Sequence, residues 1–171
     1  MHNVFKKPAV AAALVLFSAY SASDAPQLPP VAWKVCNRSV TVCAAMHPKT
    51  GATVFKVDSN FVATEAYKIE GWHNQVFVSD DGQFFVSGYR GLNLVPIDVK
   101  PSQVMLTVWK NGAKHLEVSL GQIVKDFSLL RPTASHYFWG TVSGLSGAVL
   151  SLNTVAGPVA INIETGVVSK Q

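Results

Sequence analysis

Two short stretches of the sequence combine aromatic rings with histidine, and these residue types bind small ligands by stacking and hydrogen bonding. Trp72 and His73 come just before one predicted strand, and residues 136–139, with the sequence HYFW, lead into another. If folding brings the two stretches together, they form a small recognition groove. The same residue types also fill the core of a small β-domain, which is the favoured interpretation. The candidate binding residues are Trp72, His73, His136, Tyr137 and Trp139.

Cys36 and Cys43 are the only cysteines of the chain, and their pairing depends on the turn between them. If residues 39–40 form a two-residue hairpin loop, the two cysteines stand directly opposite and can form a cross-strand disulfide. If residues 37–39 form the loop, Cys36 faces Val40 and Cys43 points to the other side of the ribbon. Asparagine is the better turn former and valine the poorer one, which favours the second layout. The sequence therefore leaves the disulfide open.

No residue pattern for catalysis or for a cofactor is present. No serine lies in G-x-S-x-G, and on an extended strand the neighbours Ser135 and His136 point to opposite faces. Asp80 and Asp81 precede Gly82, where their first role is turn formation. Beyond the first 23 residues, histidines occur at positions 47, 73, 115 and 136, but none forms a local metal-binding pair such as H-x3-H. The sequence thus predicts no catalytic residue, no metal site and no cofactor.

The elements that must position these residues are short runs rich in Val, Phe, Thr and Ile, separated by Gly, Asn and Asp. This pattern is typical of an antiparallel β-protein. The predicted strands cover residues 33–37, 40–46, 53–58, 66–70, 75–79, 84–88, 104–110, 114–119, 141–145, 149–153 and 159–163.

Three turns carry clear hairpin chemistry, at residues 48–51, 80–82 and 111–112. The runs on either side of Asn111-Gly112 alternate, which predicts one face with Val104, Leu106 and Val108. The other face is predicted to carry Met105, Thr107 and Trp109.

One helical interruption is predicted between residues 120 and 130, where apolar residues recur at spacings of three and four. Ser119 is available as the N-terminal cap, and Pro132 ends the run. Asp126 could instead start a second helical turn at Phe127, which would divide the segment.

Residues 78–88, with the sequence VSDDGQFFVSG, resemble the inner hairpin of a β-propeller blade. Residues 47–51 and 164–166 are similar to the turn that joins blade strands in such proteins. A blade takes roughly 40–45 residues and a closed ring at least four blades, so this chain is short for a conventional propeller. The wider stretch 72–140 resembles uncharacterised secreted bacterial proteins, which implies no known activity. We expect an all-β antiparallel meander (an open sheet, a sandwich or a propeller-like fragment) with one short helical segment.

The start of the chain has the pattern of a secretory signal peptide. Lys6 and Lys7 precede an apolar run over residues 9–20, and small residues follow at 21–23. The run is shorter than the roughly 20 residues that cross a bilayer as a helix. We expect a signal peptide over residues 1–23, an extended proline-rich linker over 24–31, and a single β-rich domain over 32–171. An uncleaved N-terminal anchor is the alternative. The predicted localisation is periplasmic or secreted, in a bacterium.

The net charge of +4 includes Lys6 and Lys7, and the other Lys and Arg are scattered. Nucleic-acid binding is therefore not predicted, nor is stable membrane insertion after signal cleavage. The expected function is a non-catalytic binding or interaction module, with another envelope protein as its partner. The alternative is an envelope hydrolase or metal-dependent enzyme whose site is assembled from distant histidine and aromatic residues.

Overall fold

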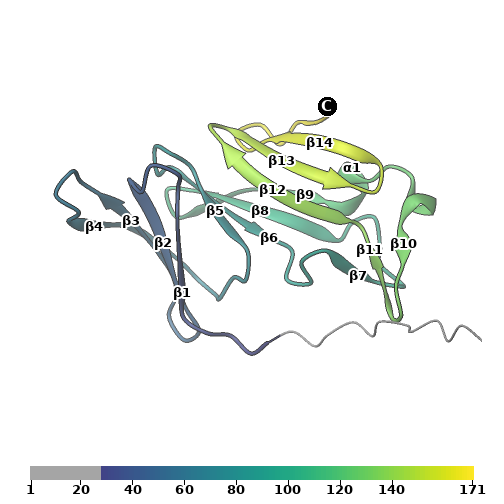
Figure 1. Ribbon diagram of the computed structural model, residues 1–171, viewed down its shortest axis with the longest axis horizontal. Coiled ribbons are helices and arrows are strands. Elements are labelled where there is room, and N and C mark those ends of the chain that lie inside the picture. Colours follow the sequence, from purple (N-terminus) through teal and green to yellow (C-terminus); the bar gives the residue numbers. More distant parts are fainter. Residues whose placement is uncertain (1–27) are drawn as a thin grey trace, which may run out of the picture.

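The computed structural model describes residues 28–171, which fold into four antiparallel sheets (Figure 1). The predicted signal peptide and the first half of the predicted linker, residues 24–27, lie outside these residues. What we name the first sheet has the order β1-β2-β3-β4 and is a simple meander. Its strands are β1 (Trp33–Cys36), β2 (Val42–His47), β3 (Gly51–Val57) and β4 (Ala63–Ile69).

The middle sheet and the last sheet are also four-stranded meanders, with the orders β5-β6-β8-β9 and β12-β13-β14-β15. The middle sheet consists of β5 (Val76–Val78), β6 (Phe84–Gly88), β8 (Val104–Lys110) and β9 (Ala113–Ser119). The last sheet consists of β12 (Gly140–Ser146), β13 (Val149–Thr154), β14 (Gly157–Asn162) and β15 (Val168–Lys170). A small sheet pairs β10 (Arg131–Pro132), β11 (His136–Phe138) and β7 (Leu94–Pro96).

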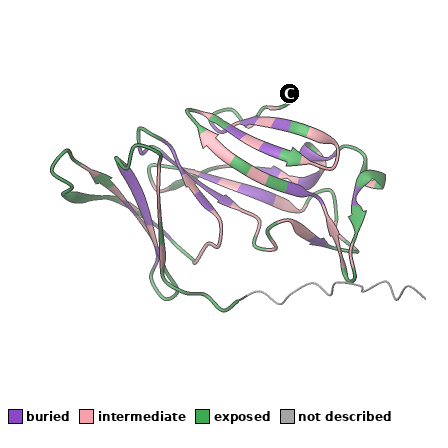
Figure 2. Cartoon of the chain, viewed as in Figure 1, coloured by how far each residue is buried: buried purple, intermediate pink, exposed green. Residues whose placement is uncertain are grey.

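The middle sheet is covered on both faces, because the first and last sheets pack on opposite sides of it (Figures 1 and 2). Phe85 and Val54 belong to the apolar cluster between the first and middle sheets. Phe84 and Leu152 belong to a larger cluster between the middle and last sheets. Neighbouring residues of β6 therefore enter different cores, which explains why Phe84, Phe85 and Val86 are all buried.

One of the two edge strands of each four-stranded sheet, β4, β9 or β15, carries charge. In β4, Lys68 and Glu65 form an ion pair at 3.4 Å, and in β9 Lys114 pairs with Glu117. The outermost strand of the last sheet, β15, carries Lys170. These three charged strands are mostly exposed (Figure 2).

All three predicted hairpins are present, but the alternation predicted for β8 is wrong at one residue. A β-bulge between Val104 and Leu106 shifts the register against β9. As a result Met105 joins the cluster that contains Leu106 and Val108, whereas Trp109 packs against the other cluster. A bulge inserts one extra residue into a strand, so side chains on either side of it no longer alternate.

The predicted helical segment is present and divided. The first turn is α1 (Leu120–Ile123), where the Gln122 side chain accepts hydrogen bonds from the Ser119 N–H and hydroxyl at 2.8 and 3.1 Å. The second is the 3-10 turn η1 (Phe127–Leu129), where Asp126 accepts from the Ser128 N–H at 2.9 Å. Asp126 therefore starts a separate turn, because its carboxylate caps the free N–H that an uninterrupted helix would have used.

Cys36 and Cys43 are directly opposite in the β1-β2 ladder and form a disulfide with an S–S distance of 2.04 Å. The layout that the turn residues favoured, with a loop over residues 37–39 and the two cysteines on opposite sides of the ribbon, is therefore wrong. Asn37 supports a wider loop, since its N–H donates to the Val42 carbonyl at 2.9 Å and its side-chain oxygen accepts from the Val42 N–H at 3.1 Å. The loop closes with Val40 in the left-handed region, at φ 60°, which a β-branched residue rarely adopts.

Candidate functional site

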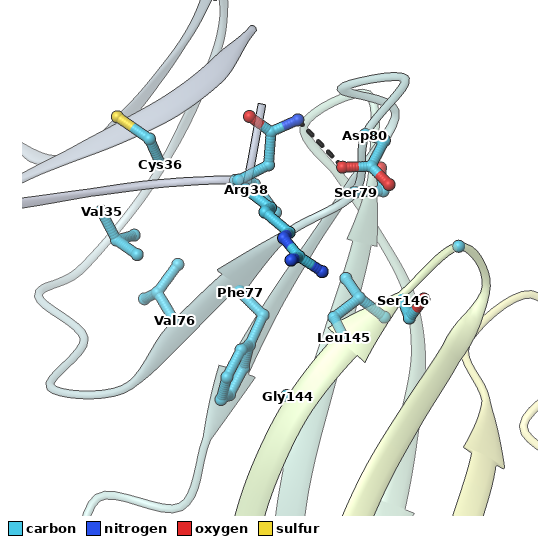
Figure 3. A pocket seen from close by; sticks show the side chains of 13 residues that line it. Val35, Cys36, Arg38, Val76, Phe77, Ser79, Asp80, Gly144, Leu145 and Ser146 are labelled. Atoms are coloured by element: carbon cyan, nitrogen blue, oxygen red, sulfur yellow. Dashed lines mark hydrogen bonds between the residues drawn. The ribbon is translucent and has the colours of Figure 1, made fainter. Parts of the chain in front are cut away.

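A pocket of about 340 Å³ lies where the first strands of the three four-stranded sheets come together (Figure 3). Strand β1 and its following loop form one wall, β5 forms the second, and the end of β12 forms the third. This volume is at the lower end of the range for ligand pockets, about 300–1,000 Å³. The pocket is lined by residues 35–38, 76–80 and 144–147.

A hydrogen bond between two turns holds the pocket mouth together. The Asn37 side-chain amide donates to the Asp80 carboxylate at 3.0 Å and so ties the β1-β2 loop to the β5-β6 hairpin (Figure 3). The hairpin is itself fixed, because the Ser79 hydroxyl donates to Asp81 at 2.6 Å and accepts from the Phe84 N–H at 2.9 Å. Two hydrogen-bonded turns from different sheets thus lie at the opening.

The floor of the pocket is apolar, and one cation lies above it. Val35, Val76, Phe77 and Leu145 supply the apolar surface. The Arg38 guanidinium reaches from the β1-β2 loop toward β12 (Figure 3). Arg38 is exposed and makes no hydrogen bond or ion pair with any residue in the range 28–171. A guanidinium in this position offers several donors to a carboxylate or another planar anion.

A second hollow of about 240 Å³ continues from the pocket and shares Ser79, Asp80 and Gly147 with it. Its other charged residues are Asp81 and Glu164, so three carboxylates gather there. Burial raises the pKa of Asp81, but hydrogen bonds from Ser79 and from the Gln83 N–H outweigh it and hold that pKa below its ordinary value. The two hollows together place one positive charge beside a negative region.

The two aromatic stretches that the sequence singled out lie in different parts of the molecule. Trp72 packs against the cluster between the first and middle sheets, and its ring N–H donates to the Val31 carbonyl at 2.8 Å. Trp139 is 1% exposed in the cluster between the middle and last sheets, and its ring N–H donates to the Leu92 carbonyl at 2.8 Å. His136 and Tyr137 lie on β11 in the small sheet. The structure does not bring these residues into one groove.

His136 has a neighbour that strand alternation does not predict. The Ser135 hydroxyl lies 2.9 Å from its Nδ1, because Ser135 precedes β11 in a bend and so does not alternate with it. The prediction that these two side chains point apart is wrong for this reason.

His73 is half-buried in a polar niche beside the apolar cluster of the first and middle sheets. Its Nδ1 lies 3.0 Å from the Ser87 hydroxyl and its Nε2 lies 3.2 Å from the Glu70 carbonyl. The ring also contacts Phe85 and Trp109 edge-on. Burial lowers the pKa of His73 below 6.5, although the bond to the Glu70 carbonyl partly opposes this. These contacts suit the neutral imidazole.

The lowered pKa predicts how stability responds to acid. Between the folded-state pKa of His73 and about 6.5, the unfolded chain binds the proton and the folded chain does not, so the free energy of unfolding falls as pH falls. We expect wild-type protein to lose more stability than His73→Gln between about pH 7.5 and about pH 5, in urea titrations followed by fluorescence. Equal losses in the two proteins would contradict this assignment.

The pocket residues were not identified from the sequence. Asn37 and Asp80 are 43 positions apart and sit in ordinary turn sequences, and Arg38 is a single arginine without a basic neighbour. The only available signal was the blade-like hairpin at 78–88, since Asp80 lies in its turn.

Two negative findings complete the description of the site. Among residues 28–171, no group of three or more His, Cys, Asp or Glu residues could hold a metal ion, and no helix is long and apolar enough to cross a membrane. Comparison with protein-family models, curated proteins and solved structures found no match to this chain.

Proposed function

We propose that this protein is exported to the periplasm or the exterior of a bacterium and works there as a non-catalytic binding module. The observation that carries the proposal is the pocket itself: an unpaired guanidinium, Arg38, stands over an apolar floor built from three different sheets. Pockets with a mainly apolar lining and a few directed polar groups are the usual form of a binding site. The partner is another envelope protein.

Two further features support export. The first residues have the order of a signal peptide, with a positive segment, a short apolar run and small residues. The Cys36–Cys43 disulfide is of the kind that forms in oxidising compartments. Both features favour a protein that works outside the cytosol.

The rival proposal, an envelope hydrolase, gains one observation: the contact between the Ser87 hydroxyl and His73 Nδ1. A hydroxyl next to an imidazole is the first requirement of a serine nucleophile. Ser87, however, is 8% exposed, and neither residue lines the pocket described above. We therefore assign this pair a structural role, which a screen for hydrolysis with wild type and His73→Gln tests directly.

Affinity capture from the envelope fraction of the host tests the binding proposal. We expect wild-type protein to retain a companion protein at fixed stoichiometry, and Arg38→Glu to lose it, because reversal of the charge removes the anion contact. Arg131→Gln is the matched control, since Arg131 is an exposed arginine on β10 outside the pocket. Equal capture by all three proteins, or no companion with any of them, would refute binding through this pocket.

A further inference from the structure

Strand β5 presents an unused edge to the pocket. Its only sheet partner among the described strands is β6, and two hydrogen bonds bracket the ladder: Ser79 N–H to the Phe84 carbonyl and Gly88 N–H to the Gln75 carbonyl, each at 3.0 Å. In an antiparallel pair, alternate residues bond to the neighbour and the others point away. The backbone N–H and C=O groups of Val76 and Val78 therefore face the pocket.

Strand β1 presents a second such edge. The Asn37 N–H donates to the Val42 carbonyl at 2.9 Å, so the same alternation turns the backbone groups of Lys34 and Cys36 away from β2. Val76 and Val78 are only 4% and 6% exposed as whole residues and both line the pocket, so a ligand reaches their backbone groups only through the pocket. The pocket is thus a groove walled by strand edges.

The two ends of the groove carry opposite charge, which would orient a bound peptide. Arg38 lies at the pocket, and the second hollow beyond Ser79 holds Asp80, Asp81 and Glu164. An extended peptide presents backbone donors and acceptors at the spacing of a strand edge, and it can carry an acidic and a basic side chain at separate positions.

We propose that the groove binds an extended segment of a partner protein, which adds as a strand to the free edge of β5. The segment places an acidic side chain against Arg38 and a basic side chain toward the carboxylates of the second hollow. This inference rests on the proposed binding function and names the chemistry of its partner. Backbone pairing supplies the affinity, and the two charges set the direction of the segment.

Labelled synthetic peptides test the charge requirement on the full chain. The probe is an eight-residue peptide of alternating valine and threonine with one glutamate near one end and one lysine near the other. We expect Arg38→Glu to weaken its binding at least tenfold, and Arg131→Gln to change it less than twofold. A peptide with glutamine in place of the glutamate should bind wild type as weakly as the original peptide binds Arg38→Glu. The affinity of this glutamine peptide should not fall further in the Arg38→Glu variant.

Backbone chemistry tests strand addition itself. N-methylation of every second residue of the peptide removes the donors on one edge only, so one of the two alternate sets should abolish binding and the other should preserve it. In the free protein the Val76 and Val78 amides should exchange hydrogen quickly and the Phe77 amide slowly. The peptide should protect both valine amides.

Several outcomes would overturn the inference. Peptide binding that is unchanged in Arg38→Glu would contradict the charge contact. An equal loss of affinity with both N-methylated peptides would contradict strand pairing. A free dicarboxylate that binds with the same dependence on Arg38, without protection of the valine amides, identifies a small-molecule site instead. If the peptides fail but the captured companion still depends on Arg38, the acidic segment is wrong and the binding function stands; if capture fails as well, both proposals fall.

Discussion

Replacement of Trp139 by alanine is expected to lower the free energy of unfolding by about 3–5 kcal/mol, enough to unfold a marginal domain. The indole is 1% exposed and belongs to the larger apolar cluster, where it joins the middle and last sheets. Its removal leaves a cavity and also leaves the Leu92 carbonyl without the donor that now lies 2.8 Å away. Urea denaturation followed by circular dichroism measures the loss.

Two further variants separate a packing role from a recognition role. Phe61→Ala is the control, because Phe61 is 83% exposed and its truncation should leave stability nearly unchanged. Trp139→Phe keeps most of the apolar surface but not the N–H. Its loss in free energy of unfolding should therefore lie between those of Trp139→Ala and Phe61→Ala. A Trp139→Ala protein that unfolds at the wild-type urea concentration but no longer binds its partner would assign Trp139 to recognition and contradict the packing role.

Loss of the Cys36–Cys43 disulfide is expected to lower the free energy of unfolding by about 2–3 kcal/mol in the chain-entropy model. The cysteines are seven positions apart, so the bond closes a short loop in the unfolded chain and its effect is moderate. The double variant Cys36→Ala with Cys43→Ala should therefore remain folded in the cold and melt at lower temperature than wild type.

Mass spectrometry provides the direct measurement of this bond. Protein isolated from its native compartment and alkylated without reductant should carry no label, and protein alkylated after reduction should carry two. Two labels without reduction would contradict the bond. Reduced wild type should then match the double alanine variant in its melting temperature, which controls for the effect of the substitutions themselves.

Local turn chemistry explains why much of the fold could be predicted from the sequence. Asn111-Gly112 and Asp81-Gly82 each provide a residue that adopts positive φ easily, at 85° for Gly112 and 73° for Gly82. Each turn fixes the register of its two flanking strands. All of the predicted strands overlap observed ones, and the all-β meander is confirmed.

Among the described strands, β7, β10, β11 and β15 were not predicted; the first three form the small sheet and β15 pairs with β14. Residues 94–96 form β7 only because β11 lies beside them, with Tyr137 opposite Val95. Pro132 was interpreted only as the end of the helical run, but it lies in β10, an edge strand of the small sheet, where proline is tolerated. A two- or three-residue ladder of this kind leaves no periodicity in the sequence.

The candidate site could not be predicted from the sequence, because it too depends on contacts between distant parts of the chain. Each of its walls is an ordinary strand or turn, and the pocket exists only because three sheets meet at their first strands. Residue type alone drew attention to Trp139 and His73, which are rich in possible chemistry but are held by packing and internal hydrogen bonds. Arg38 became notable only when the structure showed its surroundings.

The charges on the outermost strands bear on how this protein avoids aggregation. Glu65 and Lys68 on β4, and Lys114 and Glu117 on β9, make edge-to-edge association between copies unfavourable, which is a common protection of exposed strands. Strand β5 has the sequence VFV and no such protection. We therefore expect edge-to-edge contact between copies to be suppressed at β4 and β9, and a concentrated solution of the chain to self-associate first through the edge of β5.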